Sequence, residues 1–65
     1  MNIVVNDEPK VVAARTLATL IGELGLADAR IATAVDGAFV PASGRENLAL
    51  TDGMKIEIVA PRQGG

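Results

Sequence analysis

Apolar and polar residues alternate most regularly near the end of the chain, over residues 54–59. In an extended backbone, Met54, Ile56 and Ile58 lie on one side, and charged residues take the intervening positions. This period of two predicts a strand with one buried and one solvent-facing side. Residues 48–50 and a tight turn ending at Gly53 come before it.

A helical period begins after Thr16, which is a suitable N-cap residue because its hydroxyl can accept a hydrogen bond from an early helical N–H. The following apolar residues recur at i, i+3, i+4 and i+7 and therefore share one helix face: Leu17, Leu20, Ile21 and Leu24. Gly25 is placed to end the helix in a left-handed conformation. Gly22 costs the helix roughly 1 kcal/mol relative to Ala. The sequence leaves open whether the backbone packs closely at Gly22.

The remaining segments predict two hairpins. Residues 1–6 are rich in β-branched side chains, residues 7–10 supply turn formers, and residues 11–14 resume an extended chain. Residues 31–35 predict another strand, and Asp36-Gly37 is typical of a type I′ hairpin turn. Phe39 and Val40 continue the hairpin, Pro41 ends it, and residues 42–47 read as a polar loop.

The order of these elements is hairpin, helix and further strands. A helix that joins two strands of one sheet favours parallel neighbours, so the last strand is expected beside the first. Ile3, Val5, Ile56 and Ile58 would then pack under the helical leucines. We therefore predict an α+β fold of the β-grasp type, with a mixed four- to five-stranded sheet packed on one main helix. Residues 1–65 form a single domain in this prediction, with a flexible tail over residues 60–65.

Composition excludes several function classes. The chain has 65 residues, neither Cys nor His, and six scattered basic residues against eight acidic ones, for a net charge of −2. With no basic stripe and with Phe39 as its only aromatic residue, it is not expected to bind nucleic acid. Without His or Cys it lacks the commonest general base and the best nucleophile at neutral pH, so it is not expected to be an enzyme or to hold a metal. No signal peptide or long apolar run is recognisable, which predicts a cytoplasmic protein without membrane contact.

The given sequence ends in Gly64-Gly65, directly after an apolar strand and a short segment that contains Pro61. Because glycine has no Cβ, such an end can thread a channel too narrow for other residues. This suits a protein whose own carboxyl terminus is the substrate of another enzyme. The alternative is a frayed chain end, which glycine also tolerates.

The hairpin segment Val-Asp-Gly-Ala-Phe-Val-Pro over residues 35–41, the Asp-Gly turn before the last strand and the diglycine end together resemble the thiamine-biosynthesis sulfur carrier (ThiS) family. The resemblance covers essentially the whole chain. The sequence departs from the family at Asp36, where Asn is common, and in the loop at residues 44–46, where a bulky residue is frequent. Neither departure touches the diglycine end.

The resemblance implies a ubiquitin-like carrier that binds no cofactor itself. A partner adenylyltransferase related to ubiquitin-activating enzymes would use ATP to adenylate the carboxylate of Gly65. A sulfur donor system would convert the adenylate to a thiocarboxylate, and a thiazole synthase would take the sulfur. Gly64 would give the end access to the partner, and Arg62 would either make an acidic contact or remain a solvated tail charge.

Partner docking also requires an apolar area on the body of the domain. The candidates are Phe39, Val40 and Val59. Phe39, as the sole aromatic residue of a small domain, is expected to fill the core instead. Val59 is the better candidate for a surface contact because it falls on the same side of its strand as Lys55 and Glu57.

Two alternatives remain open at this stage. The first is a sulfur carrier of another pathway, such as the small subunit of molybdopterin synthase, although chains of that type tend to be longer and richer in aromatic residues. The second is a β-grasp interaction module with incidental glycines, or a ubiquitin-like modifier joined to lysines. Conjugates of higher mass in cell extracts would identify the modifier.

Overall fold

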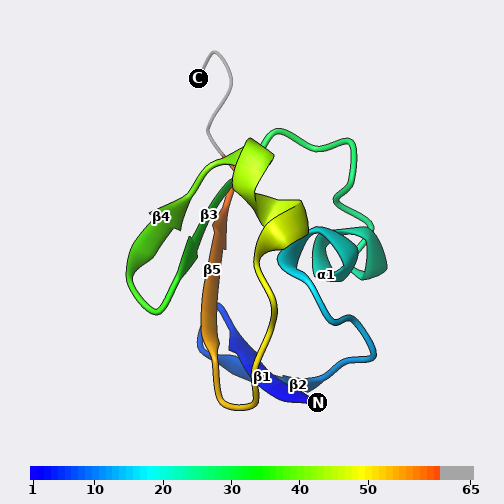
Figure 1. The fold of residues 1–65 in the computed structure, drawn as a ribbon, viewed down its shortest axis with the longest axis vertical. Helices are drawn as coiled ribbons and strands as arrows, with labels where there is room; N and C mark the ends of the chain where they lie inside the picture. The colour runs from blue at the N-terminus through cyan, green and yellow to red at the C-terminus, as the bar shows by residue number, and fades with distance from the viewer. Residues whose placement is uncertain (61–65) are drawn as a thin grey trace.

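Five strands form one mixed sheet in the computed structural model, which describes residues 1–60. The elements in chain order are β1 (Asn2–Val5), β2 (Glu8–Val11), α1 (Leu17–Glu23), β3 (Ala32–Val35), β4 (Ala38–Val40), the 3₁₀ helix η1 (Ala42–Asn47) and β5 (Lys55–Val59). The strand order is β2-β1-β5-β3-β4, with β1 and β5 parallel and the other pairs antiparallel. The helix α1 lies on one side of the sheet, with η1 next to it (Figure 1). The predicted α+β, β-grasp architecture and the parallel pairing of the first and last strands are confirmed.

Both ends of α1 are capped as the sequence predicts. Thr16 and Thr19 form a reciprocal capping box, in which each side chain accepts a hydrogen bond from the backbone N–H of the other. At the other end, Gly25 has a φ of 76° and donates to Gly22 O, and Leu26 donates to Ile21 O. These two bonds form a Schellman motif, for which the left-handed glycine is needed.

Gly22 does not mark a close backbone approach. A Cβ atom added at this position would meet nothing within 4 Å, and the residue is exposed. The helix therefore tolerates the conformational cost of glycine here, which answers the question that the sequence left open.

The core lies between α1 and the sheet. The predicted helix face is correct, since Leu17 and Leu20 are fully buried and Ile21 is 4% exposed. The buried apolar residues are Ile3, Val5, Ala14, Leu17, Leu20, Ile21, Val35, Val40, Leu50 and Ile56. Ile58, which was expected among them, is only partly buried at the margin of this cluster.

The first hairpin turns earlier than the sequence predicts. Asn6 and Asp7 form the turn, with positive φ values of 49° and 68°, whereas residues 8–10 belong to β2. Asn and Asp adopt the left-handed region more easily than other non-glycine residues, so they can make a tight turn without glycine. Pro9, taken as a turn former, is tolerated in β2 because this strand lies at the sheet edge and proline lacks only a ladder donor.

The second hairpin is confirmed, but the segment after it is more regular than predicted. Asp36 and Gly37 have φ values of 48° and 86°, as a type I′ turn requires. The expected polar loop is η1, and Arg45 within it donates to Thr33 Oγ1 at 3.1 Å and to Ile31 O at 2.8 Å. The buried Thr33 hydroxyl in turn donates to Val40 O at 2.8 Å. This network fixes η1 against β3 and β4.

Candidate functional site

The face of the sheet opposite α1, here called the outer face, carries an exposed group of apolar side chains. Directly paired residues of neighbouring strands project to the same face. Phe39 on β4 lies opposite Ala34 on β3, and Ala32 on β3 lies opposite Val59 on β5. Phe39 is 70% exposed and Val59 is 60% exposed. We call these four residues the apolar patch.

The patch changes two of the predictions made from the sequence. Phe39 was expected to fill the core, but its pairing with Ala34 turns it to the outer face. Val40 was a candidate contact residue, but it pairs with Thr33, faces the core and is only 8% exposed. Its side chain is therefore unavailable to a partner. Val59 is exposed and lies on the same side of β5 as Glu57, as expected.

The predicted reactive end lies beyond the part of the chain that the structure describes. Gly64, Gly65 and Arg62 are outside the described residues, so their predicted roles stay predictions. Val59 is the last residue of β5, and Gly65 follows it by six positions in the sequence. The apolar patch therefore includes the strand end from which the chain runs on towards Gly65.

Asn6 contributes a feature that the sequence reasoning missed. Its side-chain Oδ1 accepts from the backbone N–H of Ile58 at 2.9 Å, and its Nδ2 donates to Ile58 O at 3.1 Å. Its own backbone N–H donates to Ile56 O at 2.9 Å. We call this set of bonds the Asn6 clamp. Asn in a turn is a signal for side-chain bonds to nearby backbone, but not for a partner 52 positions away.

Two acidic side chains accept hydrogen bonds from strand backbone near the opposite end of β5. Asp36 Oδ1 accepts from the N–H of Lys55 at 3.0 Å, and the Asp36 N–H donates to Lys55 O at 2.8 Å. Asp52 Oδ1 accepts from the N–H of Asn2 at 2.9 Å, next to a bond from Gly53 N to Asn2 O at 2.8 Å. Asp36 therefore fits its position as an acceptor for a strand N–H.

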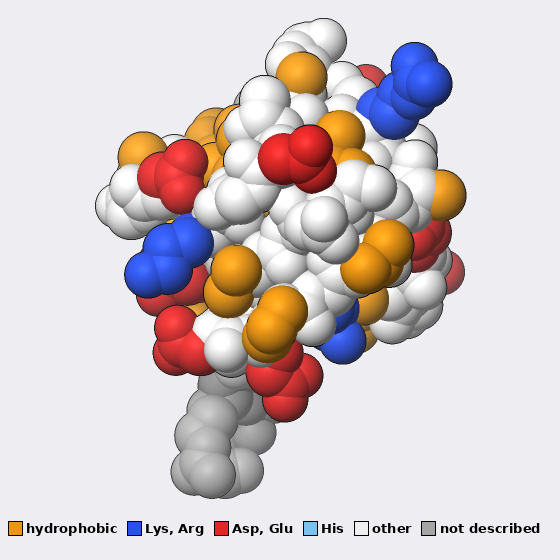
Figure 2. All heavy atoms as spheres, turned by 90° about the horizontal axis from the view of Figure 1, so that it is seen from below, with side chains coloured by type: hydrophobic (Ala, Val, Ile, Leu, Met, Phe, Trp, Pro, Cys, Tyr) orange, Lys and Arg blue, Asp and Glu red, His pale blue; other side chains and the backbone are white. Residues whose placement is uncertain are grey.

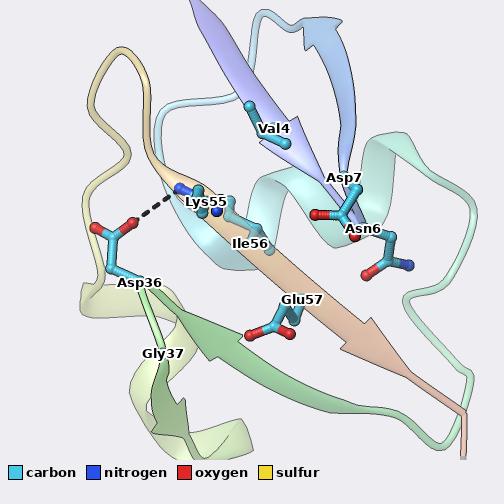
Figure 3. Close-up of a pocket in the computed structure, with 8 residues that line it drawn as sticks. All are labelled: Val4, Asn6, Asp7, Asp36, Gly37, Lys55, Ile56 and Glu57. Carbon is cyan, nitrogen blue, oxygen red and sulfur yellow. Dashed lines mark hydrogen bonds between the residues drawn. The ribbon is translucent and has the colours of Figure 1, made fainter.

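An open hollow of about 520 Å³ lies over the middle of β5 on the outer face (Figure 3). It is lined by Val4, Asn6, Asp7, Asp36, Gly37, Lys55, Ile56 and Glu57. The lining brings carboxylates near one lysine but includes neither an imidazole nor a thiol. Within residues 1–60, no three His, Cys, Asp or Glu side chains come together so as to hold a metal ion.

Charge and hydropathy add little that is specific to a site. On the face seen in Figure 2, acidic and basic side chains are interspersed with apolar ones, and the acidic ones predominate. Such a surface lacks the broad basic area that neutralises phosphates. None of the helices over residues 1–60 has the length and hydrophobicity needed to cross a bilayer.

Comparison with known proteins connects this architecture to one family. The model of the ThiS family matches residues 2–65. Among solved structures, a crystal structure of thiamine biosynthesis protein ThiS from Geobacter metallireducens superposes with a TM-score of 0.83, 25% identity and coverage of 100% of both chains. A solution NMR structure of a thiamine biosynthesis protein from the same organism gives a TM-score of 0.79 at 23% identity, covering 100% of this chain and 88% of the other. No curated protein sequence gave a significant match.

Proposed function

The chain belongs to the ThiS family, whose members are sulfur carriers of thiamine biosynthesis and not enzymes, and on this premise we propose that the carboxylate of Gly65 carries the sulfur. The observation that supports the proposal most is the extent of the family match. It runs over residues 2–65 and so includes the diglycine as well as the folded body. A match confined to the sheet and helix would have supported a binding module equally well.

The proposed chemistry needs only a carboxylate from this chain. An α-carboxylate is ionised at neutral pH, so that of Gly65 can attack the α-phosphorus of ATP bound by a partner adenylyltransferase. Pyrophosphate leaves, and an acyl-adenylate remains on the carrier. Hydrosulfide supplied by a donor system then adds to the carbonyl carbon, AMP leaves with the bonding electron pair, and loss of the thiol proton gives a thiocarboxylate. A thiazole synthase takes the sulfur in the last step, in the cytoplasm.

The apolar patch supports the body contacts that this sequence of partners requires. Two enzymes must bind the same carrier in turn, and transient interfaces need a desolvated apolar centre with a polar rim. Phe39 and Val59 form the exposed part of such a centre. Lys55 and Glu57 lie beside them on the outer face and supply a polar margin. Gly64 and Arg62 would then extend the contact into the partner, with Gly64 passing where a side chain would not fit.

The intact mass of the chain tests this function directly. The protein is isolated from cells that are making thiamine and from matched cells that lack the adenylyltransferase. We expect the first sample to contain a species in which one oxygen is replaced by sulfur, and the second to be unmodified. An unmodified mass in both samples would exclude the carrier function.

Transfer of the sulfur separates the thiamine pathway from the molybdopterin alternative. The thiocarboxylate form is incubated with a thiazole synthase and its substrates, and in parallel with the large subunit of a molybdopterin synthase. Family membership predicts that the first enzyme consumes the thiocarboxylate and that the second leaves it intact. Consumption of the thiocarboxylate only by the molybdopterin synthase large subunit would instead assign the carrier to molybdopterin biosynthesis.

Truncation of the exposed aromatic side chain should weaken docking without unfolding the domain. We expect Phe39→Ala to raise the KM of the adenylyltransferase for the carrier by about fivefold or more, because a buried interface aromatic commonly contributes more than about 1 kcal/mol. Its melting temperature should change little, since the side chain is 70% exposed in the free protein. Val11→Ala is the matched control, an 81% exposed apolar residue on the other edge strand. An equal effect of both variants on KM would argue against the patch.

A further inference from the structure

The end of β5 extends past the strand that pairs with it on one side. The parallel pairing with β1 comprises Val4 with Lys55 and Val5 with Ile56, and β1 ends at Val5. On the other side, β3 continues to pair with β5 as far as Val59. Without a substitute for β1, the backbone of Ile58 would have no partner on this side.

The Asn6 clamp is that substitute. A primary amide carries a donor and an acceptor on one planar group, as a peptide unit does. The Asn6 amide offers Oδ1 to the N–H of Ile58 and Nδ2 to the carbonyl of the same residue. The left-handed φ of 49° turns the main chain away into the hairpin while the side chain stays beside β5. Asn is one of the few residues that adopts this φ readily and still has an amide to offer.

The clamp acts next to the proposed docking area. Ile58 precedes Val59, which belongs to the apolar patch, and Gly65 lies seven positions beyond Ile58. If this strand end were free, a partner would have to order it on binding, and ordering of a mobile segment reduces affinity. A strand end that is already held removes this cost.

We propose that Asn6 is a positioning residue for the reaction at Gly65. Its side-chain amide holds the end of β5, so that the apolar patch and the start of the tail are presented to the adenylyltransferase in one fixed arrangement. The inference rests on the proposed function, because it concerns the same reaction. Asn6 touches neither ATP nor the reacting carboxylate in this account and acts only through β5.

The chain offers variants that separate the clamp from the turn. Asn6→Gly keeps the left-handed φ, which glycine adopts freely, and removes the amide. Asn6→Asp keeps an acceptor for the N–H of Ile58 but loses the donor to its carbonyl. Asp52→Ala is the matched control, because it removes a carboxylate that accepts from the N–H of Asn2, near the opposite end of β5.

The experiment uses the full chain and two measurements. Hydrogen exchange followed by NMR reports on the Ile58 amide. ATP–pyrophosphate exchange by the adenylyltransferase gives kcat and KM for the carrier. Both measurements are made at a temperature well below the melting temperature of every variant. For Asn6→Gly we expect faster exchange at Ile58 and a KM raised about three- to tenfold, with kcat nearly unchanged. For Asn6→Asp, both the exchange rate at Ile58 and the KM should lie between the values of Asn6→Gly and those of the original chain. Asp52→Ala should leave both the Ile58 exchange and the KM as they were.

Other outcomes would overturn the inference in distinguishable ways. Unchanged exchange at Ile58 in Asn6→Gly would show that the clamp does not hold the strand. Faster exchange with an unchanged KM would make Asn6 a structural residue only. A KM raised equally in Asp52→Ala would assign the effect to general destabilisation. If the original chain supported no pyrophosphate exchange at all, the proposed function itself would fail, and the positioning role with it.

Discussion

Removal of Gly65 is expected to reduce adenylation at least about a hundredfold while the domain stays folded. The shortened chain still ends in a carboxylate, on Gly64, but this group is displaced along the chain by one residue, roughly 3.3–3.6 Å. A misplacement of about 1 Å in a reacting group can cost on the order of a hundredfold in rate. The measurement is ATP–pyrophosphate exchange by the adenylyltransferase, with the intact chain as reference.

Two controls define what this result means. Thermal unfolding of the shortened chain should match that of the intact chain, because every residue of the buried core lies between Ile3 and Ile56. Gly65→Ala retains the carboxylate at the same chain position and adds one methyl group. It therefore tests whether adenylation depends on the width of the partner's channel, whereas the deletion tests whether it depends on the length of the chain. Full adenylation of the shortened chain would contradict the assignment of Gly65 as the attachment site.

The second large effect, on the free energy of unfolding, is expected from truncation of Leu20, in the middle of the buried face of α1. Leu20 is 0% exposed, and truncation of a buried leucine to alanine typically costs about 2–5 kcal/mol. A domain of 65 residues has a total stability of roughly 3–10 kcal/mol, so Leu20→Ala is expected to unfold much of the protein at moderate temperature. Denaturant unfolding followed by circular dichroism measures the loss.

A milder variant keeps this prediction measurable if Leu20→Ala does not fold. Ile21→Val removes one methylene from the same face and should cost about 0.5–1.5 kcal/mol. Val11→Ala, at an 81% exposed position, should change the free energy of unfolding by less than about 0.5 kcal/mol. A Leu20→Ala protein as stable as the original would contradict the packing of α1 on the sheet.

The elements that could be predicted from the sequence are those with a local cause. The type I′ turn at Asp36-Gly37, the Thr16 cap and the alternation in β5 each depend on a few neighbouring residues, and all three are present. The first hairpin is present as predicted, but the position of its turn was wrong because the turn, at Asn6 and Asp7, has no glycine. The turn was predicted at residues 7–10 because Pro9 is a common turn residue, but residues 8–10 belong to the edge strand β2.

The candidate site was harder to predict because it depends on strand register. Phe39 and Val40 are adjacent, and a shift of one residue exchanges which of them is buried. The pairing of Phe39 with Ala34 settles this, and no local pattern specifies it. The Asn6 clamp joins the turn after the first strand to the end of the last strand, so a window of neighbouring residues could not reveal it.

The central place of β5 in the sheet has a consequence for the biosynthesis of the protein. Among the described elements, β5 is the last to leave the ribosome, yet it lies between β1 and β3. Until it arrives, the two hairpins have no strand to join them, and each exposes an unpaired edge. The nascent chain thus cannot complete its sheet before the segment that leads to Gly65 has been made. A product terminated before β5 therefore lacks the middle strand of its sheet and leaves the edges of both hairpins unpaired.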